Sequence, residues 1–255
     1  MSFKVGVLFE VRTDEPWSKE NSDVGEMMYH RAMHCRTLAG FVLALLLAGA
    51  IPNAFGAELT GSVNPNEAWR LASGNGDIAI YSRPHPGSPL NEFKAIGAID
   101  APTYAVHAVI DDFLNYPKFM PCTTECRLIK REDDSIVGYQ RLSPKICADR
   151  DYTLRVWKKA WPASDGFVFM SYWTTANELG PSEKKGIVRV KICNGGWLLE
   201  PDGATKTRAS YSVYTDAGGM IPAFIANRTS QVGISRLFAA IRKQVKNPKY
   251  AARQF

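Results

Sequence analysis

The stretch that decides the fold runs from Gly218 to Pro248 and reads GGMIPAFIANRTSQVGISRLFAAIRKQVKNP. Pro222 stands where the first turn of a helix tolerates proline, and Asn247-Pro248 ends the pattern. Apolar residues recur at helical spacing between these limits, namely Ile221, Phe224, Ile225, Ile234, Leu237, Phe238, Ile241 and Val245. The stretch therefore predicts one amphipathic helix of about 25 residues, nearly 40 Å long at ~1.5 Å per residue.

Seven short runs of alternating apolar residues precede this helix. Turn-forming residues separate them, most clearly Glu132-Asp133-Asp134 and Asp165-Gly166. Strands joined in succession by short turns form an antiparallel sheet. The seven runs are Glu125–Arg131, Ile136–Leu142, Arg150–Lys158, Phe167–Thr175, Ile187–Ile192, Gly196–Glu200 and Thr207–Thr215.

The segment before these runs predicts two helices and two more strands. Asn66 to Ser73 predicts a short helix with Trp69 as its apolar anchor, and Ile78–Ser82 and Glu92–Ile99 predict strands. Asp100 is placed to cap a second helix, which carries toward the core Tyr104, Val106, Val109, Ile110, Phe113 and Leu114.

The element order indicates an α+β fold in which the long helix covers one apolar face of the sheet. Bulky sheet residues opposite a single helix leave a gap rather than a solid core, and such a gap is a site for an apolar ligand. The sequence therefore predicts a cavity between the sheet and the final helix.

Period-two alternation indicates which sheet residues face this gap. The apolar members of three strands are Tyr152, Leu154 and Val156; Val188, Val190 and Ile192; Tyr211 and Val213. Both faces of the strand at 167–175 carry bulky side chains. The pattern therefore does not decide whether Phe169 and Trp173 or Met170 and Tyr172 face the gap. Plain core packing is the alternative interpretation of each residue.

An apolar run from Leu38 to Ala50 follows Arg31 and Arg36 and predicts a secretory signal peptide. We expect cleavage between Gly56 and Ala57, with a retained anchor as the alternative, although the run is shorter than the ~20 residues of a spanning helix. Residues 1–32 are interpreted as a non-native or disordered extension, 33–56 as the signal, 57–247 as the ligand-binding domain and 248–255 as a basic tail. The protein is expected to be exported, to the periplasm or the medium.

The formal net charge of +6 is concentrated near the C-terminus, where no acidic residue follows Asp216. A solvated helix end and attraction to an anionic membrane both explain this excess. Export argues against a nucleic-acid partner, and we expect a monomer without a cofactor.

Four cysteines remain in the expected mature chain, namely Cys122, Cys126, Cys147 and Cys193. Two disulfides, Cys122–Cys126 and Cys147–Cys193, and free buried thiols are equally compatible with the sequence. Neither His85 nor His107 lies at ligand spacing from these thiols, so no metal site is predicted.

Six motifs in order resemble the START family, the lipid-transfer domains related to steroidogenic acute regulatory protein. They are Trp69 with 76–83; 93–97; Pro144 with Arg150-Asp151-Tyr152; 185–190; 196–201; and 218–222 with Asn227-Arg228. The resemblance covers about Asn66 to Val245 and implies a helix-grip fold with a tunnel for one sterol, phospholipid or similar molecule. It also implies a gate made of the loop Asn177–Lys185 and the final helix, exchange at a membrane surface, and no catalysed reaction.

The alternation and the resemblance together give the candidate ligand-binding residues. They are Tyr139, Tyr152, Leu154, Val156, Phe169, Trp173, Val188, Val190, Trp197, Tyr211, Val213, Ile221, Phe224 and Ile225. Arg150 and Asp151 form either an ion pair that shapes the sheet end, which we prefer, or a charged end of the cavity. Val156 stands where several sterol-binding relatives carry an arginine, so a sterol is not the default cargo.

Two other functions stay open. A cyclase or dehydratase of the same fold needs positioned acid–base groups. The sequence offers His85 in a turn and His107 on the outer half of a helix, neither with an identifiable carboxylate partner. An interaction module that docks on another envelope protein through its basic end is the third hypothesis.

Overall fold

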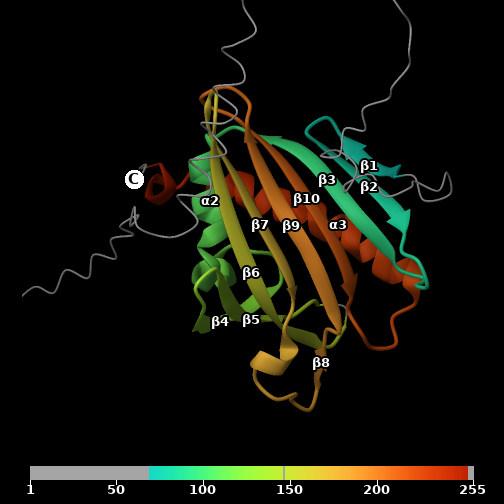
Figure 1. Cartoon of the computed structure of the whole chain (residues 1–255). Coiled ribbons are helices and arrows are strands. Elements are labelled where there is room, and N and C mark those ends of the chain that lie inside the picture. Colours follow the sequence, from blue (N-terminus) through green and yellow to red (C-terminus); the bar gives the residue numbers. More distant parts are fainter. Residues whose placement is uncertain (1–68, 146, 252–255) are drawn as a thin grey trace, which may run out of the picture. The chain divides into compact units, whose positions relative to one another are not determined.

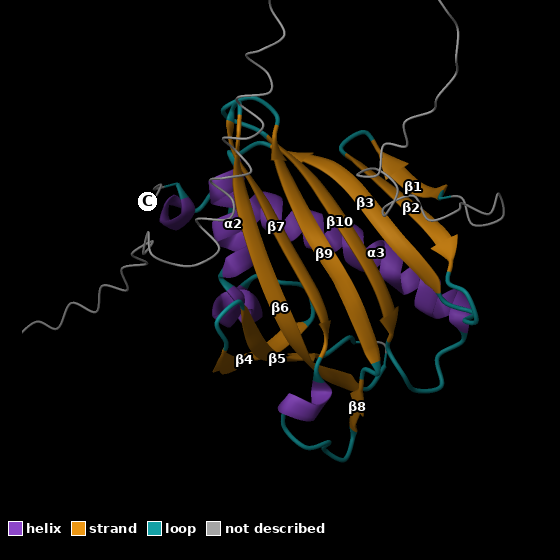
Figure 2. Cartoon of the chain, in the orientation of Figure 1, coloured by secondary structure: helices purple, strands orange, loops and turns teal. Residues whose placement is uncertain are grey.

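The computed structural model describes residues 69–145 and 147–251, which form one large sheet with helices packed on one of its faces (Figures 1 and 2). The strands are β1 (Arg70–Asn75), β2 (Ile78–Pro84), β3 (Asn91–Ile99), β4 (Thr123–Arg131), β5 (Ser135–Leu142), β6 (Asp149–Ala163), β7 (Gly166–Thr175), β8 (Ile187–Arg189), β9 (Ile192–Pro201) and β10 (Thr207–Asp216). The helices are α2 (Thr103–Asp111) and α3 (Ala223–Gln244), with short 3₁₀ turns η2 (Phe113–Lys118), η3 (Asn177–Leu179) and η4 (Pro248–Tyr250).

The sheet confirms the predicted antiparallel architecture. Its strand order is β1-β2-β3-β10-β9-β7-β6-β5-β4, and β8 pairs in parallel with the start of β6. Two-residue turns close the tightest hairpins, as at Ser164-Asp165, where Ala163 pairs with Gly166. The fold is therefore α+β, with the final helix lying along the sheet as predicted.

The helix predicted over Asn66 to Ser73 is wrong in its described part, because residues 70–75 form strand β1. Asn75 pairs with Ile78 across a turn at Gly76, whose φ of 42° suits glycine. The local sequence offers one apolar anchor, Trp69, and this ring instead lies 4.7 Å from the guanidinium of Arg83 on β2. Pairing with the β2 edge overrides a weak local preference for helix.

Three further details of the structure differ from the prediction. The first helix ends at Asp111 and has no side-chain cap, since Asp100 lies exposed and faces Lys206 at 3.9 Å. Leu114, predicted in the core, is exposed in η2. The run Ile187–Ile192 divides between β8 and β9, because β8 leaves the meander to pair with β6.

The main core lies between α3, α2 and the adjoining strands. Phe238 of α3 is fully buried, and a Cβ at Gly97 of β3 would lie 3.0 Å from its ring. The absent side chain of Gly97 therefore lets the helix approach the sheet closely. The other fully or nearly buried members include Ile80, Phe93, Ala95, Ile99, Val106, Val109, Leu199, Ala209, Ile234 and Ile241.

The segment after α3, which begins the expected basic tail, starts with the 3₁₀ turn η4, and this turn packs against the end of α2. Tyr250 is buried, and its hydroxyl donates to the Asp112 carboxylate at 2.7 Å. Lys249 Nζ lies 2.6 Å from the same carboxylate. No helix among the described residues is long and apolar enough to cross a membrane. The expected leader and extension lie outside the described residues.

The thiols of Cys122, Cys126, Cys147 and Cys193 are all free in the structure. The alternative of free buried thiols holds for Cys193 alone, because Cys122 is exposed and Cys126 and Cys147 are half-buried.

Candidate functional site

Strand register separates the side chains that face α3 from those that face away. Opposite residues in one row of the sheet share a face, and the row Ala95, Tyr211, Trp197, Ser171 lies on the side of α3, where Trp197 contacts Phe238 with ring centroids 5.2 Å apart. We call this side the inner face and the other the outer face. Both faces can be followed strand by strand from the pairing register.

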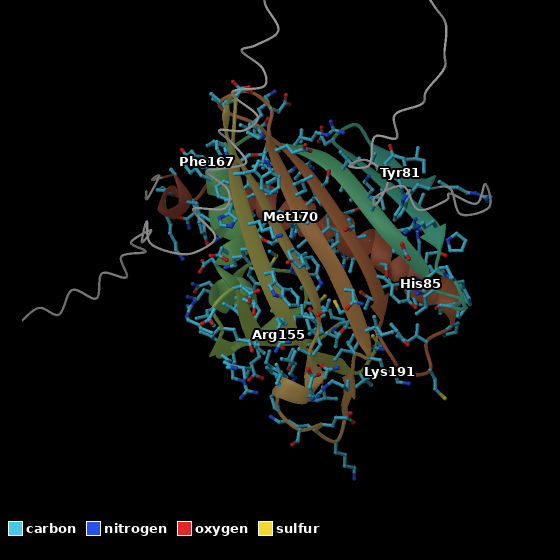
Figure 3. All side chains as sticks on the ribbon, viewed as in Figure 1. Tyr81, His85, Arg155, Phe167, Met170 and Lys191 are labelled. Atoms are coloured by element: carbon cyan, nitrogen blue, oxygen red, sulfur yellow. The ribbon has the colours of Figure 1, made fainter. Side chains whose placement is uncertain are left out.

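The register decides the choice that alternation leaves open in β7. Trp173 pairs with Gly195 and Val156, and Phe169 pairs with Leu199, so both aromatic rings lie on the inner face. Trp173 approaches Tyr211 with ring centroids 5.9 Å apart. Met170 and Tyr172 lie on the outer face, where Met170 is labelled in Figure 3.

Most of the predicted ligand residues on β6, β7 and β10 share the inner face and are only half-buried. They are Tyr152, Leu154, Val156, Phe169, Trp173, Tyr211 and Val213. Close packing would enclose apolar side chains that point into a protein, as it encloses the neighbouring Trp197 and Leu199. The retained accessible surface therefore distinguishes this part of the inner face from the packed core.

Three tyrosines in this region are strongly desolvated. Burial raises the pKa of Tyr116, Tyr152 and Tyr211 well above its ordinary value. Tyr116 donates its hydroxyl to the carbonyl of Ile110, whereas the hydroxyls of Tyr152 and Tyr211 have no hydrogen-bond partner among the described residues. Buried hydroxyls usually have partners, so these two are donors free for a ligand.

Tyr116 was missed by the sequence analysis. It lies in the turn η2, where its ring makes edge contacts with Phe113 and Phe119, and no local pattern in the sequence identifies it as part of the site. Burial also raises the pKa of the neighbouring Cys126 thiol, to about 12, so neutral groups line this part of the site.

Tyr139 and Asp151 lie on the outer face, so the assignment of Tyr139 to the cavity is wrong, as is the alternative that Asp151 lies at a charged end of the cavity. The Tyr139 hydroxyl donates to Asp151 Oδ2 at 3.1 Å, and Arg189 Nε donates to Asp151 Oδ1 at 2.6 Å. The preferred ion pair between Arg150 and Asp151 is therefore wrong. Asp151 pairs with Arg189 instead, because neighbouring residues of a strand point to opposite faces.

The segment predicted as a gate is attached to the outer face at its beginning. Asn177 Oδ1 accepts from the amide of Thr153 at 2.9 Å, and its Nδ2 donates to the carbonyl of Val190 at 2.8 Å. Arg189 donates to the carbonyl of Pro181 at 2.9 Å. A Cβ at Gly180 would lie 1.9 Å from Thr153 Oγ1. These contacts fix residues 177–181, and residues 182–186 are exposed.

The remaining predicted residues divide between the interior and the surface. Val190 is buried, and Val188 lies beside the Gly218-Gly219 segment, 3.2 Å from a Cβ built at Gly218. Ile221 is half-buried. Phe224 and Ile225 are 74% and 39% exposed and Met220 is fully exposed, so Phe224 and Ile225 do not line the interior in this structure.

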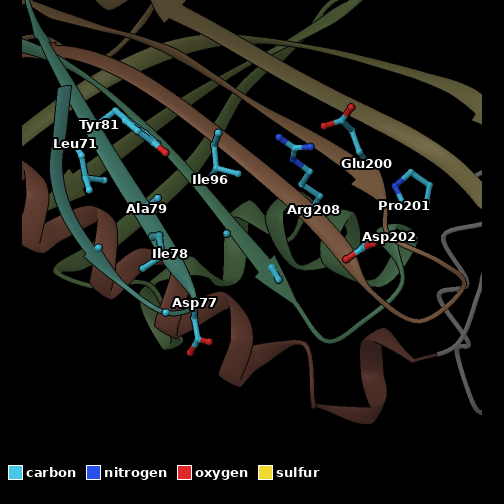
Figure 4. Close-up of a pocket in the computed structure, with 14 residues that line it drawn as sticks. Leu71, Asp77, Ile78, Ala79, Tyr81, Ile96, Glu200, Pro201, Asp202 and Arg208 are labelled. Carbon is cyan, nitrogen blue, oxygen red and sulfur yellow. The ribbon is translucent and has the colours of Figure 1, made fainter. Parts of the chain in front are cut away.

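A separate open pocket of about 770 Å³ lies near β1 (Figure 4). Its lining includes Tyr81, Ile96, Glu200 and Arg208 of the outer face. It contains none of the predicted ligand residues. Its polar rim makes it a poor match for an apolar cargo.

The two described histidines have neighbours that the sequence did not identify. His107 stacks on Phe169 with ring centroids 4.2 Å apart, and burial lowers its pKa against the opposing effect of Asp111. His107 therefore points toward the sheet, and its predicted position on the outer half of the helix is wrong. His85 Nδ1 lies 2.7 Å from Glu92 Oε1 on the outer face. No cluster of potential metal ligands occurs among the described residues.

Comparisons with known proteins agree with this geometry. A family model described as polyketide cyclase / dehydrase and lipid transport matches residues 99–242. An uncharacterised protein of Pseudomonas aeruginosa is 27% identical over 191 residues, which are 74% of this chain and 90% of that protein. Mouse phosphatidylcholine transfer protein is 22% identical over 192 residues, 75% of this chain and 90% of the relative.

A solved structure gives the same result. The STAR-related lipid transfer protein of Xanthomonas axonopodis superposes with a TM-score of 0.62 at 27% identity, covering 70% of this chain and 99% of the other. The resemblance to START domains and the helix-grip fold are thus confirmed. Lipid binding is supported at the level of the family.

Proposed function

Because the chain belongs to the polyketide cyclase / dehydrase and lipid transport family, we propose that it binds one lipid or similar apolar molecule between the inner face and α3. One observation carries this proposal: Tyr152 and Tyr211 are desolvated, yet they and the neighbouring apolar side chains of β6 and β7 on the inner face are only half-buried. A hollow beneath the sheet accounts for both properties. A lipid chain in that hollow would gain about 0.8 kcal/mol for each methylene removed from water.

Exchange of this cargo would take place at a membrane surface. Met220, Phe224 and Ile225 expose apolar surface around the beginning of α3, and such side chains insert into the interfacial region of a bilayer. Lys243 lies in the last turn of α3 and Lys246 just after it, at the other end of a helix of 22 residues that is about 33 Å long. The apolar end therefore makes the better membrane contact, and the basic end a secondary one.

The carrier function needs no bond to be made or broken. The competing enzyme hypothesis has one histidine beside the inner face among the described residues, His107, whose pKa is lowered by burial and whose ring packs flat on Phe169. A general acid or base needs a proton-carrying atom within reach of its substrate, and the carrier proposal assigns His107 to packing instead. We therefore propose a monomeric, non-enzymatic carrier that is exported after removal of its leader.

Native mass spectrometry of protein purified from its own host tests the proposal. A stoichiometric apolar ligand, or one acquired after incubation with mixed lipids, is the expected result. Protein that stays empty after incubation would contradict the carrier function, and turnover of an added aromatic polyketide would favour the enzyme. N-terminal sequencing of the exported protein tests cleavage after Gly56. If the mature protein contains any residue before Ala54, the predicted cleavage is wrong.

A further inference from the structure

Arg150 is a buried cation at one end of the inner face. Its side chain is on the same face of β6 as Tyr152, about 7 Å along the strand, and the residue is only 6% exposed. Arginine is rarely buried to this degree unless it is paired with an anion. A guanidinium in this position is therefore expected to have an anionic partner.

The two aspartates beside it in the sequence are both engaged elsewhere. Asp149 accepts from Arg141 Nε at 2.9 Å and from Ser143 Oγ at 2.7 Å. Asp151 accepts from Arg189 and Tyr139 on the outer face. Strand alternation turns both carboxylates away from Arg150. No carboxylate among the described residues lies within ion-pair distance of Arg150.

The guanidinium uses one nitrogen in the protein and leaves two without a partner. Nη1 donates to the carbonyl of Ala148 at 2.5 Å and approaches Cys147 Sγ at 2.8 Å, and neither partner is a carboxylate. Nε and Nη2 have no hydrogen-bond partner among the described residues. The enclosed side-chain atoms without partners are Thr153 Oγ1 and Trp173 Nε1, so Nε and Nη2 of Arg150 still border open space.

The free side of Arg150 lies under the segment that leads into α3. A Cβ at Gly219 would be 3.7 Å from Nη2, and the same glycine lies beside Val188. Gly218 and Gly219 both have left-handed backbone, with φ of 66° and 76°. Larger residues would be strained there and would crowd this end of the hollow.

We propose that Arg150 binds the anionic phosphate or carboxylate group of the lipid that occupies the hollow. This inference rests on the proposed function and adds the chemical class of the ligand's polar end. The planar guanidinium presents Nε and Nη2 as a fork that matches two oxygens of such a group. The Tyr152 hydroxyl, next along the same face, is a further donor for the same end of the ligand.

The test is a competition on the full exported protein after its lipid has been removed. The protein is incubated with equal amounts of dipalmitoylglycerol, dipalmitoylphosphatidylglycerol and palmitate, and the bound species are counted by native mass spectrometry. We expect at least about tenfold preference for a lipid with an anionic group over dipalmitoylglycerol. The phosphodiester and carboxylate arms show which source supplies the anion.

Variants assign the preference to Arg150. In Arg150→Met, the amount of anionic lipid bound is expected to fall about tenfold, and the amount of dipalmitoylglycerol bound is expected to stay the same. Arg150→Lys is expected to retain part of the preference for anionic lipid, because lysine keeps a point charge. Arg155→Gln is the matched control, because Arg155 lies on the same strand but on the outer face, paired with Glu132. It is expected to bind like the wild type.

Each outcome decides a separate question. If the wild-type protein binds dipalmitoylglycerol to the same extent as the two anionic lipids, the role of Arg150 is wrong, whereas the carrier function is still supported. Equal losses in Arg150→Met and Arg155→Gln also overturn it. Should Arg150→Met fail to fold, the wild-type competition and Arg150→Lys still decide. Wild-type protein that retains none of the three lipids contradicts the proposed function itself.

Discussion

The two halves of α3 have the same helical pattern but different surroundings. The C-terminal half carries Ile234, Phe238 and Ile241, all at most 4% exposed, whereas the N-terminal half carries Phe224 at 74% and Ile225 at 39%. Phe238 rests on a sheet position, Gly97, that has no side chain. Amphipathic spacing thus shows which residues share a stripe, and the opposite surface determines whether that stripe is enclosed.

The same contrast divides the inner face of the sheet. Beside the C-terminal half of α3, the strands carry enclosed residues such as Ile80 and Ala95. On β6 and β7 the strands carry Val156 and Trp173, which are half-buried. A helix can be fixed firmly through one region while it leaves another open, which is the arrangement that a removable cargo needs.

The largest test of this contrast uses two phenylalanines of one helix. Phe238→Ala should lower the free energy of unfolding by about 3–5 kcal/mol, because it opens a cavity in closely packed core. Phe224→Ala should change it by less than about 0.5 kcal/mol. Urea unfolding of both variants measures the difference. Equal losses would mean that the N-terminal half of α3 is packed in solution.

A side chain added to the open region should block cargo without unfolding the protein. Val156→Trp is expected to lower lipid occupancy about tenfold or more, since it removes volume that the ligand needs. Lys159→Trp, exposed on the outer face of the same strand, is the control and should bind normally. Native mass spectrometry with lipid mixtures measures occupancy. Unchanged binding by Val156→Trp would place the ligand elsewhere.

The exposed apolar residues at the beginning of α3 should act on exchange rather than on stability. Phe224→Ser is expected to slow lipid transfer between vesicles about fivefold, because one aromatic side chain no longer enters the interface. The control is Leu114→Ser, which alters an exposed apolar residue of η2. Transfer measured by fluorescence dequenching distinguishes them, and equal slowing would remove the special role of this end of α3.

The smallest expected effect is a pH dependence at the junction of α2 and β7. Burial lowers the pKa of His107 in the folded state, so the unfolded chain binds its proton more readily. Stability from this group is full above the unfolded pKa of about 6.5 and decreases as the pH falls toward the lower pKa of the folded state. Thermal melting of His107→Phe from pH 7.5 to 5 should show a flatter profile than wild type. An identical slope would mean that His107 is solvated.

Local patterns predicted the elements more reliably than their surroundings. The final helix and the antiparallel strands follow from periodicity, which depends only on spacing along the chain. Residues 70–73 were wrongly predicted as helix because the edge of β2, not their own preference, makes them a strand. The candidate site was likewise predictable only in part. Alternation along one strand placed Tyr152 and Val156 on the same face, but only the pairing register between strands showed that Trp173 points inward.

The amino-acid sequence by itself determined the α+β architecture, the covering helix and the family, because apolar spacing and ordered motifs are properties of the chain. Only the tertiary structure decided which partner each charge has. Asp151 turned to Arg189, and Arg150 was left buried without an anion. Two adjacent residues of opposite charge look like a pair in a sequence, but a strand sends them to opposite faces of the sheet.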